Sequence, residues 1–189
     1  CHDLDFYSLI VGCRPIKVAS FGGRRSFIPE NSPALNDEKN LDIYKEYNLE
    51  GWESKEQVFD SDADIVDHQV AIIEYENGAT LAFHTNMKVP DEFRRFAIIG
   101  TKGMAEGDFV RGYLTAHNSY TGEKIFDENF GAAFQQNTKG HYGADQLMVK
   151  DINNYLLDES NHSLPVGVVD CMEAGLVAMK IDESRVKKQ

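Results

Sequence analysis

Residues 65–87, IVDHQVAIIEYENGATLAFHTNM, decide the fold of this chain. Over 65–75, side chains that alternate with a period of two place apolar groups on both faces, which is typical of a strand with one wholly and one partly covered face. Asn77-Gly78 follows, and Asn-Gly favours a hairpin turn because both turn positions need φ > 0. Residues 79–87 return as the partner strand. The stretch therefore predicts an antiparallel β-hairpin.

Further strands and helices are predicted on both sides of this hairpin. β-Branched and aromatic residues between turn signals predict strands at 14–25, 94–99, 104–109, 112–118 and 124–130. Helical patterns predict helices at 2–11, 144–157 and 168–187. A helix, then a run of strands, then helices indicates an α+β fold. The expected architecture is an open, largely antiparallel β-sheet with helices packed on one face.

Length and composition limit the class of protein. A chain of 189 residues with 42% apolar residues is large enough to bury a core, so we expect a single domain over residues 1–189. The net charge of −12 argues against nucleic acid or an anionic membrane as partner, because both need basic patches. No apolar run approaches the ~20 residues of a membrane span. Three cysteines without a Cys-x-x-Cys pair favour a reducing compartment, and we expect the cytoplasm.

Most of the net negative charge lies in residues 30–67. This stretch has twelve carboxylates against three lysines. A charge run of this kind is typical of a solvated face. We therefore interpret it as an acidic excursion from the domain, with Tyr47 and Trp52 as aromatic contacts to the body.

A dinucleotide-binding loop is missing from the chain. That loop needs Gly-x-Gly-x-x-Gly between a strand and a helix. Here Gly22-Gly23 runs straight into two arginines, and Gly100 and Gly103 flank a predicted turn. No residue is therefore predicted to bind a cofactor. Because the chain begins with Cys1 rather than Met and enters a helix at once, we expect it to start within a longer protein.

Four segments carry a resemblance to a known family. They are His2-x-x-Asp5 with Gly12, the hairpin AIIEYENGATLA at 71–82, RFAIIGTKG at 95–103, and HYGAD at 141–145 together with the closing helix at 173–185. In this order they resemble the second domain of the Gfo/Idh/MocA oxidoreductases, which are NAD(P)-dependent sugar and cyclitol dehydrogenases. The segments run nearly from end to end of the chain, and IIGTKG is the most telling of them.

The resemblance implies an activity and an assembly. The intact enzyme would oxidise a secondary alcohol of a sugar or cyclitol, or reduce the matching ketone, with this domain binding the substrate. NAD or NADP would be bound mainly by the missing Rossmann domain, which would also supply a catalytic lysine, so this chain alone would be inactive. One sheet face would hold helices, and the other would join subunits into a homo-oligomer, a dimer or tetramer.

Two other functions fit the same residues, because one scaffold hosts many chemistries. The first is a glycosidase of the same superfamily, which uses tightly held NAD for a transient oxidation and forms no net NADH. The second is a non-catalytic module for ligand binding or assembly.

His2 is the predicted catalytic residue. Imidazole titrates near neutrality, and alcohol oxidation needs a group that takes the hydroxyl proton as hydride leaves. The alternative is an exposed histidine at a frayed chain end, and the resemblance favours the catalytic role. Asp5, one turn along the helix, could orient the imidazole or bind a substrate hydroxyl, although the helix dipole alone also favours a carboxylate there. No metal site is predicted, since Cys1, His2 and His141 lack the spacing of zinc ligands.

His141, Asp145 and Arg95 are the remaining predicted substrate contacts. Gly140 and Gly143 flank His141, which predicts a tight loop that delivers the histidine to a helix N-terminus. Asp145 would contact substrate with it, or would serve only as a first-turn carboxylate. Arg95 could hold a carboxylate or phosphate through its guanidinium group. An ion pair with the acidic excursion, or protection of a strand edge, would explain Arg95 as well.

Overall fold

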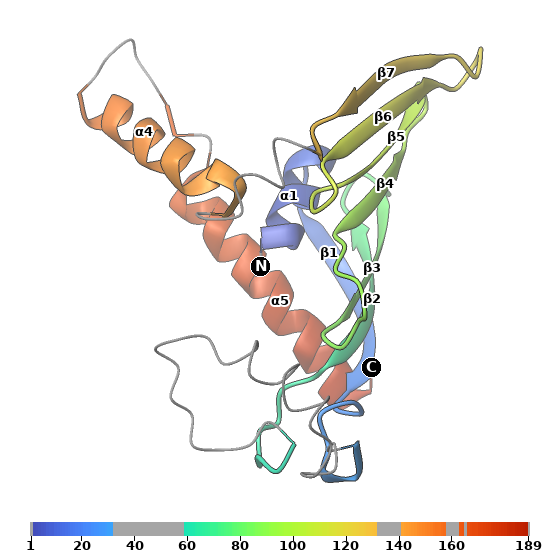
Figure 1. Cartoon of the computed structure of the whole chain (residues 1–189), viewed down its shortest axis with the longest axis vertical. Helices are drawn as coiled ribbons and strands as arrows, with labels where there is room; N and C mark the ends of the chain where they lie inside the picture. The colour runs from blue at the N-terminus through green and yellow to red at the C-terminus, as the bar shows by residue number, and fades with distance from the viewer. Residues whose placement is uncertain (1, 32–58, 132–140, 158–162, 165, 189) are drawn as a thin grey trace. The chain divides into compact units, whose positions relative to one another are not determined.

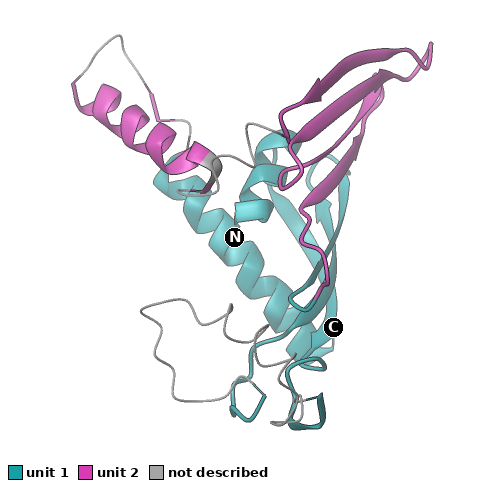
Figure 2. Cartoon of the chain, in the orientation of Figure 1, with its two compact units in different colours: residues 1–88, 167–189 teal, residues 89–166 magenta. Residues whose placement is uncertain are grey.

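The computed structural model describes residues 2–31, 59–131, 141–157, 163–164 and 166–188 (Figure 1). Residues 32–58, which make up most of the acidic excursion predicted at 30–67, lie outside the described residues. The chain divides into two compact units, residues 1–88 with 167–189 and residues 89–166 (Figure 2). We call them unit 1 and unit 2. A single domain over residues 1–189 stays a prediction.

Unit 1 is built on an antiparallel sheet of three strands in the order β1-β2-β3. Its strands and one short 3₁₀ helix are β1 (Pro15–Gly23), η1 (Pro29–Asn31), β2 (His68–Tyr75) and β3 (Thr80–Asn86). In the middle of the sheet, Ile73 of β2 lies opposite Val18 of β1 and Leu81 of β3. The predicted hairpin is therefore confirmed, and its β-branched residues lie in the sheet as their propensity favours.

The turn of this hairpin differs from the predicted geometry. Gly78 has a φ of 82°, whereas Asn77 is not among the residues with positive φ. The Gly78 N–H donates to the Tyr75 carbonyl, and the Tyr75 N–H donates to the Ala79 carbonyl, both at 2.9 Å. This pattern is a three-residue turn that ends in a glycine bulge. The expectation of φ > 0 at both Asn77 and Gly78 is therefore wrong, because only the glycine position needs it.

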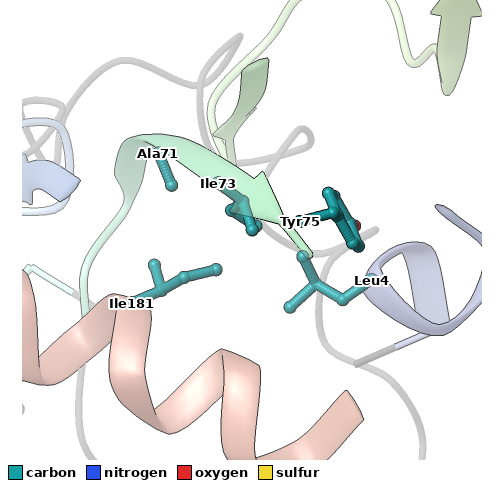
Figure 3. Close-up of a cluster of buried hydrophobic side chains, with 5 residues drawn as sticks. All are labelled: Leu4, Ala71, Ile73, Tyr75 and Ile181. Atoms are coloured by element: carbon teal, nitrogen blue, oxygen red, sulfur yellow. The ribbon is translucent and has the colours of Figure 1, made fainter. Parts of the chain in front are cut away.

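Two helices cover one face of the unit 1 sheet. They are α1 (His2–Val11) and α5 (Val168–Lys187). Figure 3 shows the buried side chains where these helices meet β2, namely Leu4, Ala71, Ile73, Tyr75 and Ile181. The three β2 residues alternate along the strand, so they all point to the covered face. Helices on one face of an antiparallel sheet are thus confirmed in this unit.

Helix α5 is fixed along β1 by a polar contact as well as by packing. The N–H of Ser20 on β1 donates to Oγ of Ser184 on α5 at 3.1 Å, and both residues are buried. β1 is an edge strand, so this N–H has no neighbouring strand to bond with. The serine satisfies a buried donor that would otherwise cost free energy.

Two side chains tie together the segments that flank residues 32–58. Oδ2 of Asp67 accepts the backbone N–H groups of three successive residues, 25–27, at 2.6–3.0 Å. Arg24 reaches from the first segment to the second, where its guanidinium donates to the Ser61 carbonyl at 2.7 Å. The base of the acidic excursion is therefore held by hydrogen bonds to backbone atoms.

Unit 2 contains a four-stranded antiparallel meander in the order β4-β5-β6-β7. Its strands are β4 (Arg95–Ile99), β5 (Gly103–Asp108), β6 (Tyr113–Asn118) and β7 (Lys124–Asn129). The 3₁₀ helix η2 (His141–Gly143) and the helix α4 (Ala144–Leu156) follow in sequence. Every strand and the helix lie where the sequence predicts them, within two residues at each end.

The seven strands of the described residues form two hydrogen-bonded sheets. Residues 87–94 separate β3 from β4 and include Pro90, which has no N–H to continue a ladder. The predicted α+β class and antiparallel pairing are confirmed, with the strands divided between the two sheets. Of the helices that the structure describes, none combines the length and the apolar character that a membrane span needs.

Candidate functional site

The first candidate site is the N-terminal turn of α1 in unit 1. His2 is exposed there, and Asp5 is half-buried one turn later. Leu4, which lies between them, is only 4% exposed. The helix therefore turns one side to the core and leaves His2 on another. Gly12 ends the helix with a φ of 72°, a left-handed conformation that glycine adopts without strain.

The imidazole of His2 is available to a ligand. Among the described residues, neither His2 nor Asp5 makes a side-chain hydrogen bond or an ion pair. Asp5 makes no direct hydrogen bond to the imidazole. A histidine with an unengaged ring can take a proton from a hydroxyl group. A carboxylate can accept a hydrogen bond from a second hydroxyl group. The roles predicted for this pair stay predictions that its chemistry permits.

The second candidate site is the η2–α4 junction in unit 2. His141 has a φ of 49° and Gly143 a φ of 92°, so the chain turns sharply just before α4. Nδ1 of His141 lies 2.9 Å from Oδ1 of Asp145, and the two side chains are 80% and 49% exposed. A carboxylate on Nδ1 favours the tautomer that leaves Nε2 as an acceptor. The structure brings these two predicted residues together, and contact with a substrate stays a prediction.

Arg95, the third predicted contact, is already paired within unit 2. Its Nε lies 3.3 Å from Oδ2 of Asp108, and its guanidinium carbon lies 4.7 Å from the ring centroid of Phe93. An ion pair with Asp108 is thus present. The Arg95 side chain is still 50% exposed, and a guanidinium has five N–H donors. Binding of a substrate anion by Arg95 therefore also stays a prediction.

Sequence reasoning missed two buried aspartates that organise the backbone. Asp67 accepts three backbone N–H groups through one oxygen, and its other oxygen lies 3.0 Å from Nδ1 of His68. Asp108 accepts three backbone N–H groups at 2.9–3.2 Å and is contacted by Arg95. The donors to Asp67 come from about 40 residues upstream in the chain. No local spacing could have revealed that contact.

Hydrogen bonding keeps both carboxylates ionised. Burial raises the pKa of Asp67, but the hydrogen bonds from His68 and from the backbone of residues 25–27 outweigh it and hold the pKa well below its usual range. Burial likewise raises the pKa of Asp108, and four hydrogen bonds to its carboxylate lower it further than burial raises it. These groups are therefore anchors for the backbone rather than proton donors at neutral pH.

A groove of about 360 Å³ lies in unit 1 between β1 and α5. Ile16, Val18 and Leu176 line it, together with Arg14 and Glu173, which form an ion pair at 2.7 Å. None of the predicted site residues lines this groove. The candidate chemistry of unit 1 is therefore on the exposed end of α1 and not in its groove.

Comparison with known proteins identifies relatives of the N-terminal half. The family model described as the GFO/IDH/MocA C-terminal domain matches residues 1–106. The protein YteT of Bacillus subtilis (strain 168), provisionally named an oxidoreductase, is 29% identical over 100 residues, which are 50% of this chain and 23% of YteT. The chain thus spans about a quarter of the length of this curated relative.

Solved structures resemble the whole chain. Levoglucosan dehydrogenase, in a complex with NADH and levoglucosan, matches with a TM-score of 0.66 and 15% identity, over 100% of this chain and 47% of that one. UDP-N-acetylglucosamine 3-dehydrogenase GnnA from Acidithiobacillus ferrooxidans matches with a TM-score of 0.60 and 17% identity, over 100% and 46% of the two chains. Likeness at this identity concerns the fold. The chain spans about half the length of these structures.

Proposed function

This chain belongs to the GFO/IDH/MocA oxidoreductase family through its C-terminal domain, and we propose that it is the substrate-binding domain of an NAD(P)-dependent dehydrogenase for a sugar or cyclitol. The substrate would be a secondary alcohol, or the matching ketone in the reverse direction. Two neighbours in fold act by name on levoglucosan and on UDP-N-acetylglucosamine. These names support a carbohydrate-like substrate.

The observation that carries the proposal is the placement of His2. Its imidazole is exposed and unengaged among the described residues, on a helix whose other side is anchored in the core. In alcohol oxidation, His2 takes the hydroxyl proton while the carbinol hydrogen leaves as hydride, so that the carbon–oxygen double bond forms. In ketone reduction, His2 returns that proton to the oxygen.

The described residues do not fit a dinucleotide. Gly22 and Gly23 lie within β1, and Gly100 and Gly103 flank the short turn that leads from β4 into β5. Neither pair forms a loop before a helix, which is the arrangement that holds a pyrophosphate. The proposal therefore assigns the nicotinamide, as the hydride acceptor, to the rest of a longer protein.

The substrate contacts we propose are Asp5, His141, Asp145 and Arg95. Asp5 and the His141–Asp145 pair offer acceptors to hydroxyl groups, as a polyol needs. Arg95 offers N–H donors to a carboxylate or phosphate on the substrate. Each of these side chains is at least partly exposed, which supports a role in contacting a ligand.

We also propose that the enzyme is a homo-oligomer, a dimer or tetramer, that assembles through the unit 1 sheet. Phe21, Val70 and Ile72 are 70%, 49% and 63% exposed on the sheet face opposite the buried cluster. Contiguous apolar surface of this kind is typical of an interface. Analytical ultracentrifugation at micromolar concentration should give a dimer or a tetramer, and a monomer would contradict this assembly.

The activity is tested on the full-length protein. We expect it to bind NAD or NADP and to form NAD(P)H in a screen of sugars and inositols. Tightly bound cofactor with no net NADH, together with release of free sugar from glycosides, would point to the redox glycosidase instead. The absence of both cofactor binding and turnover would leave a non-catalytic binding module.

A further inference from the structure

Helix α1 is held along one side by the end of the β2–β3 hairpin. Leu4, Ser8 and Val11 are spaced i, i+4 and i+7, so they form a single stripe on the helix. Each of the three contacts a residue at or near the hairpin turn. His2 lies two residues before Leu4, about 200° around the helix axis, and so projects away from the hairpin.

The first two contacts are made by Tyr75, the last residue of β2. Its side chain is only 1% exposed, and it belongs to the same buried cluster as Leu4 and Ile181. Figure 3 shows Leu4 of α1 pointing towards the Tyr75 ring. The Tyr75 hydroxyl also lies near the side chain of Ser8, one turn further along α1. One tyrosine therefore contacts two successive turns of the helix.

The third contact is made by Asn77 in the hairpin turn. Its Nδ2 donates to the carbonyl of Val11, the last residue of α1, at 3.4 Å. Its Oδ1 accepts the N–H of Ala79 at 3.0 Å, within the turn itself. The oxygen of this side chain thus closes the turn. Its nitrogen binds a carbonyl at the C-terminus of the helix, which has no partner within the helix.

The polypeptide just after the helix is bound to the same turn. The N–H of Glu76 donates to the carbonyl of Arg14 at 2.9 Å. Helix α1 and the start of β1 are therefore both fixed to the end of the hairpin. A shift of this turn would move the helix, and with it the imidazole at its first turn.

We propose that Tyr75 and Asn77 are positioning residues for His2, which they hold in place through the packed side of α1. This inference rests on the proposed function, because it concerns the proton-transfer role assigned to His2. Misplacing a reacting group by about 1 Å can cost up to ~100-fold in rate. Tyr75 and Asn77 would thus affect turnover without touching the substrate.

Two isosteric variants of the full-length enzyme test the inference. Asn77→Asp keeps the oxygen that accepts the Ala79 N–H, but it removes the donor to Val11 and places a negative charge at the helix C-terminus. Tyr75→Phe keeps the buried ring and removes the hydroxyl that meets Ser8. We expect kcat to fall about 3- to 10-fold in each variant with KM changed less, and the pH profile of kcat to shift, since the imidazole is misplaced.

The matched control is Ser20→Ala. It also removes a buried hydroxyl from the unit 1 sheet, where Ser20 Oγ donates to the Val70 carbonyl at 3.1 Å. The hydrogen bonds of Ser20 join it to Ser184, Val70 and Gln69 rather than to α1, so its variant should lose stability while kcat and the pH profile stay as in the wild type. An equal fall of kcat in Ser20→Ala would reduce the effect to general destabilisation and overturn the inference.

Amide hydrogen exchange gives a readout that does not depend on activity. In Asn77→Asp and Tyr75→Phe, the amides of α1 should exchange several-fold faster than in Ser20→Ala. If His2→Ala leaves turnover unchanged, the proposed function fails, and exchange still decides whether the hairpin holds the helix. If His2→Ala abolishes turnover while both variants keep wild-type kcat and wild-type α1 exchange, only the positioning inference fails.

Discussion

The two candidate histidines are held in opposite ways. His2 of unit 1 lies on a helix whose Leu4 is part of the buried core, and its imidazole has no partner among the described residues. His141 of unit 2 lies in a short 3₁₀ turn and is 80% exposed, and its ring is bound by Asp145 at 2.9 Å. The position of His2 is fixed by the packing of its helix against the core, and the orientation of His141 is fixed by a carboxylate.

This difference predicts which disturbances each histidine tolerates. Because α1 is packed, the role of His2 should depend on distant residues of the core that hold the helix. Because His141 is exposed, its role should depend on its immediate partner and little on the core. A proton-transfer group needs the first kind of support, and a hydroxyl contact is served by the second.

Replacing the two histidines should separate these roles, and this is the largest effect we expect. In the full-length enzyme, His2→Ala should lower kcat about 1,000-fold, within the range for a lost general acid–base group. His141→Ala should raise KM about 10-fold and change kcat less, since it removes a substrate contact. Steady-state kinetics on the best substrate measures both, and a larger loss of kcat in His141→Ala would reverse the assignment.

The loss of stability caused by truncating a leucine should also differ between the helices of the two sites. Leu4→Ala should lower the free energy of unfolding by about 2–5 kcal/mol, because it opens a cavity in the buried cluster. The matched control is Leu147→Ala on α4, where Leu147 is 64% exposed, and it should stay within about 0.5 kcal/mol of the wild type. Urea unfolding followed by circular dichroism compares them, and equal losses would show that α4 is as firmly packed as α1.

Acid should weaken unit 1 through Asp67. Its pKa is lower in the folded protein than its ordinary value of about 4. The carboxylate therefore contributes stability at neutral pH that is lost as the pH falls below about 4. Asp67→Asn should remove about 2 kcal/mol at pH 7, because an amide replaces a charged acceptor of several N–H groups, and it should flatten the pH dependence.

The measurement is the urea midpoint as a function of pH, with Asp145→Asn as the control. Asp145 is half exposed and pairs only at the surface, where an ion pair contributes about 0–1 kcal/mol. A wild-type pH dependence that persists in Asp67→Asn would show that other carboxylates govern acid unfolding.

The smallest expected effect concerns the partner of His141. Asp145→Asn should raise KM about 2- to 5-fold, because the imidazole loses the carboxylate that orients it, while kcat stays within about twofold. Asp127→Asn is a suitable control, since Asp127 makes a comparable exposed pair with Lys124 at 2.8 Å. If the two variants changed KM equally, the effect of Asp145→Asn would come from the change in net charge and not from the orientation of His141.

Much of the fold was predictable because its signals are local. The period-two pattern of 65–75, Gly78 and the helical pattern of 2–11 each specify an element from neighbouring residues. The same locality singled out His141 and Asp145 as candidates, because both flank a predicted helix start, although their contact with each other was not predicted. Even the wrong φ expected for Asn77 changed only the type of turn and left the hairpin in place.

Contacts between distant segments were not predictable in this way. Asp67 binds backbone N–H groups about 40 residues away, and Ser184 binds Ser20 across 164 positions. Such contacts depend on how distant segments fold together, so no spacing in the sequence predicts them. The division of the strands into two sheets belongs to the same class, since it depends on which strand edges meet.

The central claim, that His2 carries the proton, is tested most directly by chemical rescue. Turnover of the full-length His2→Ala variant would be measured with and without added imidazole, beside wild type and His141→Ala. We predict that imidazole restores a saturable part of the lost kcat in His2→Ala only, because the free base replaces the missing proton acceptor. A His2→Ala enzyme with wild-type turnover, or one that imidazole rescues no better than His141→Ala, would contradict the claim.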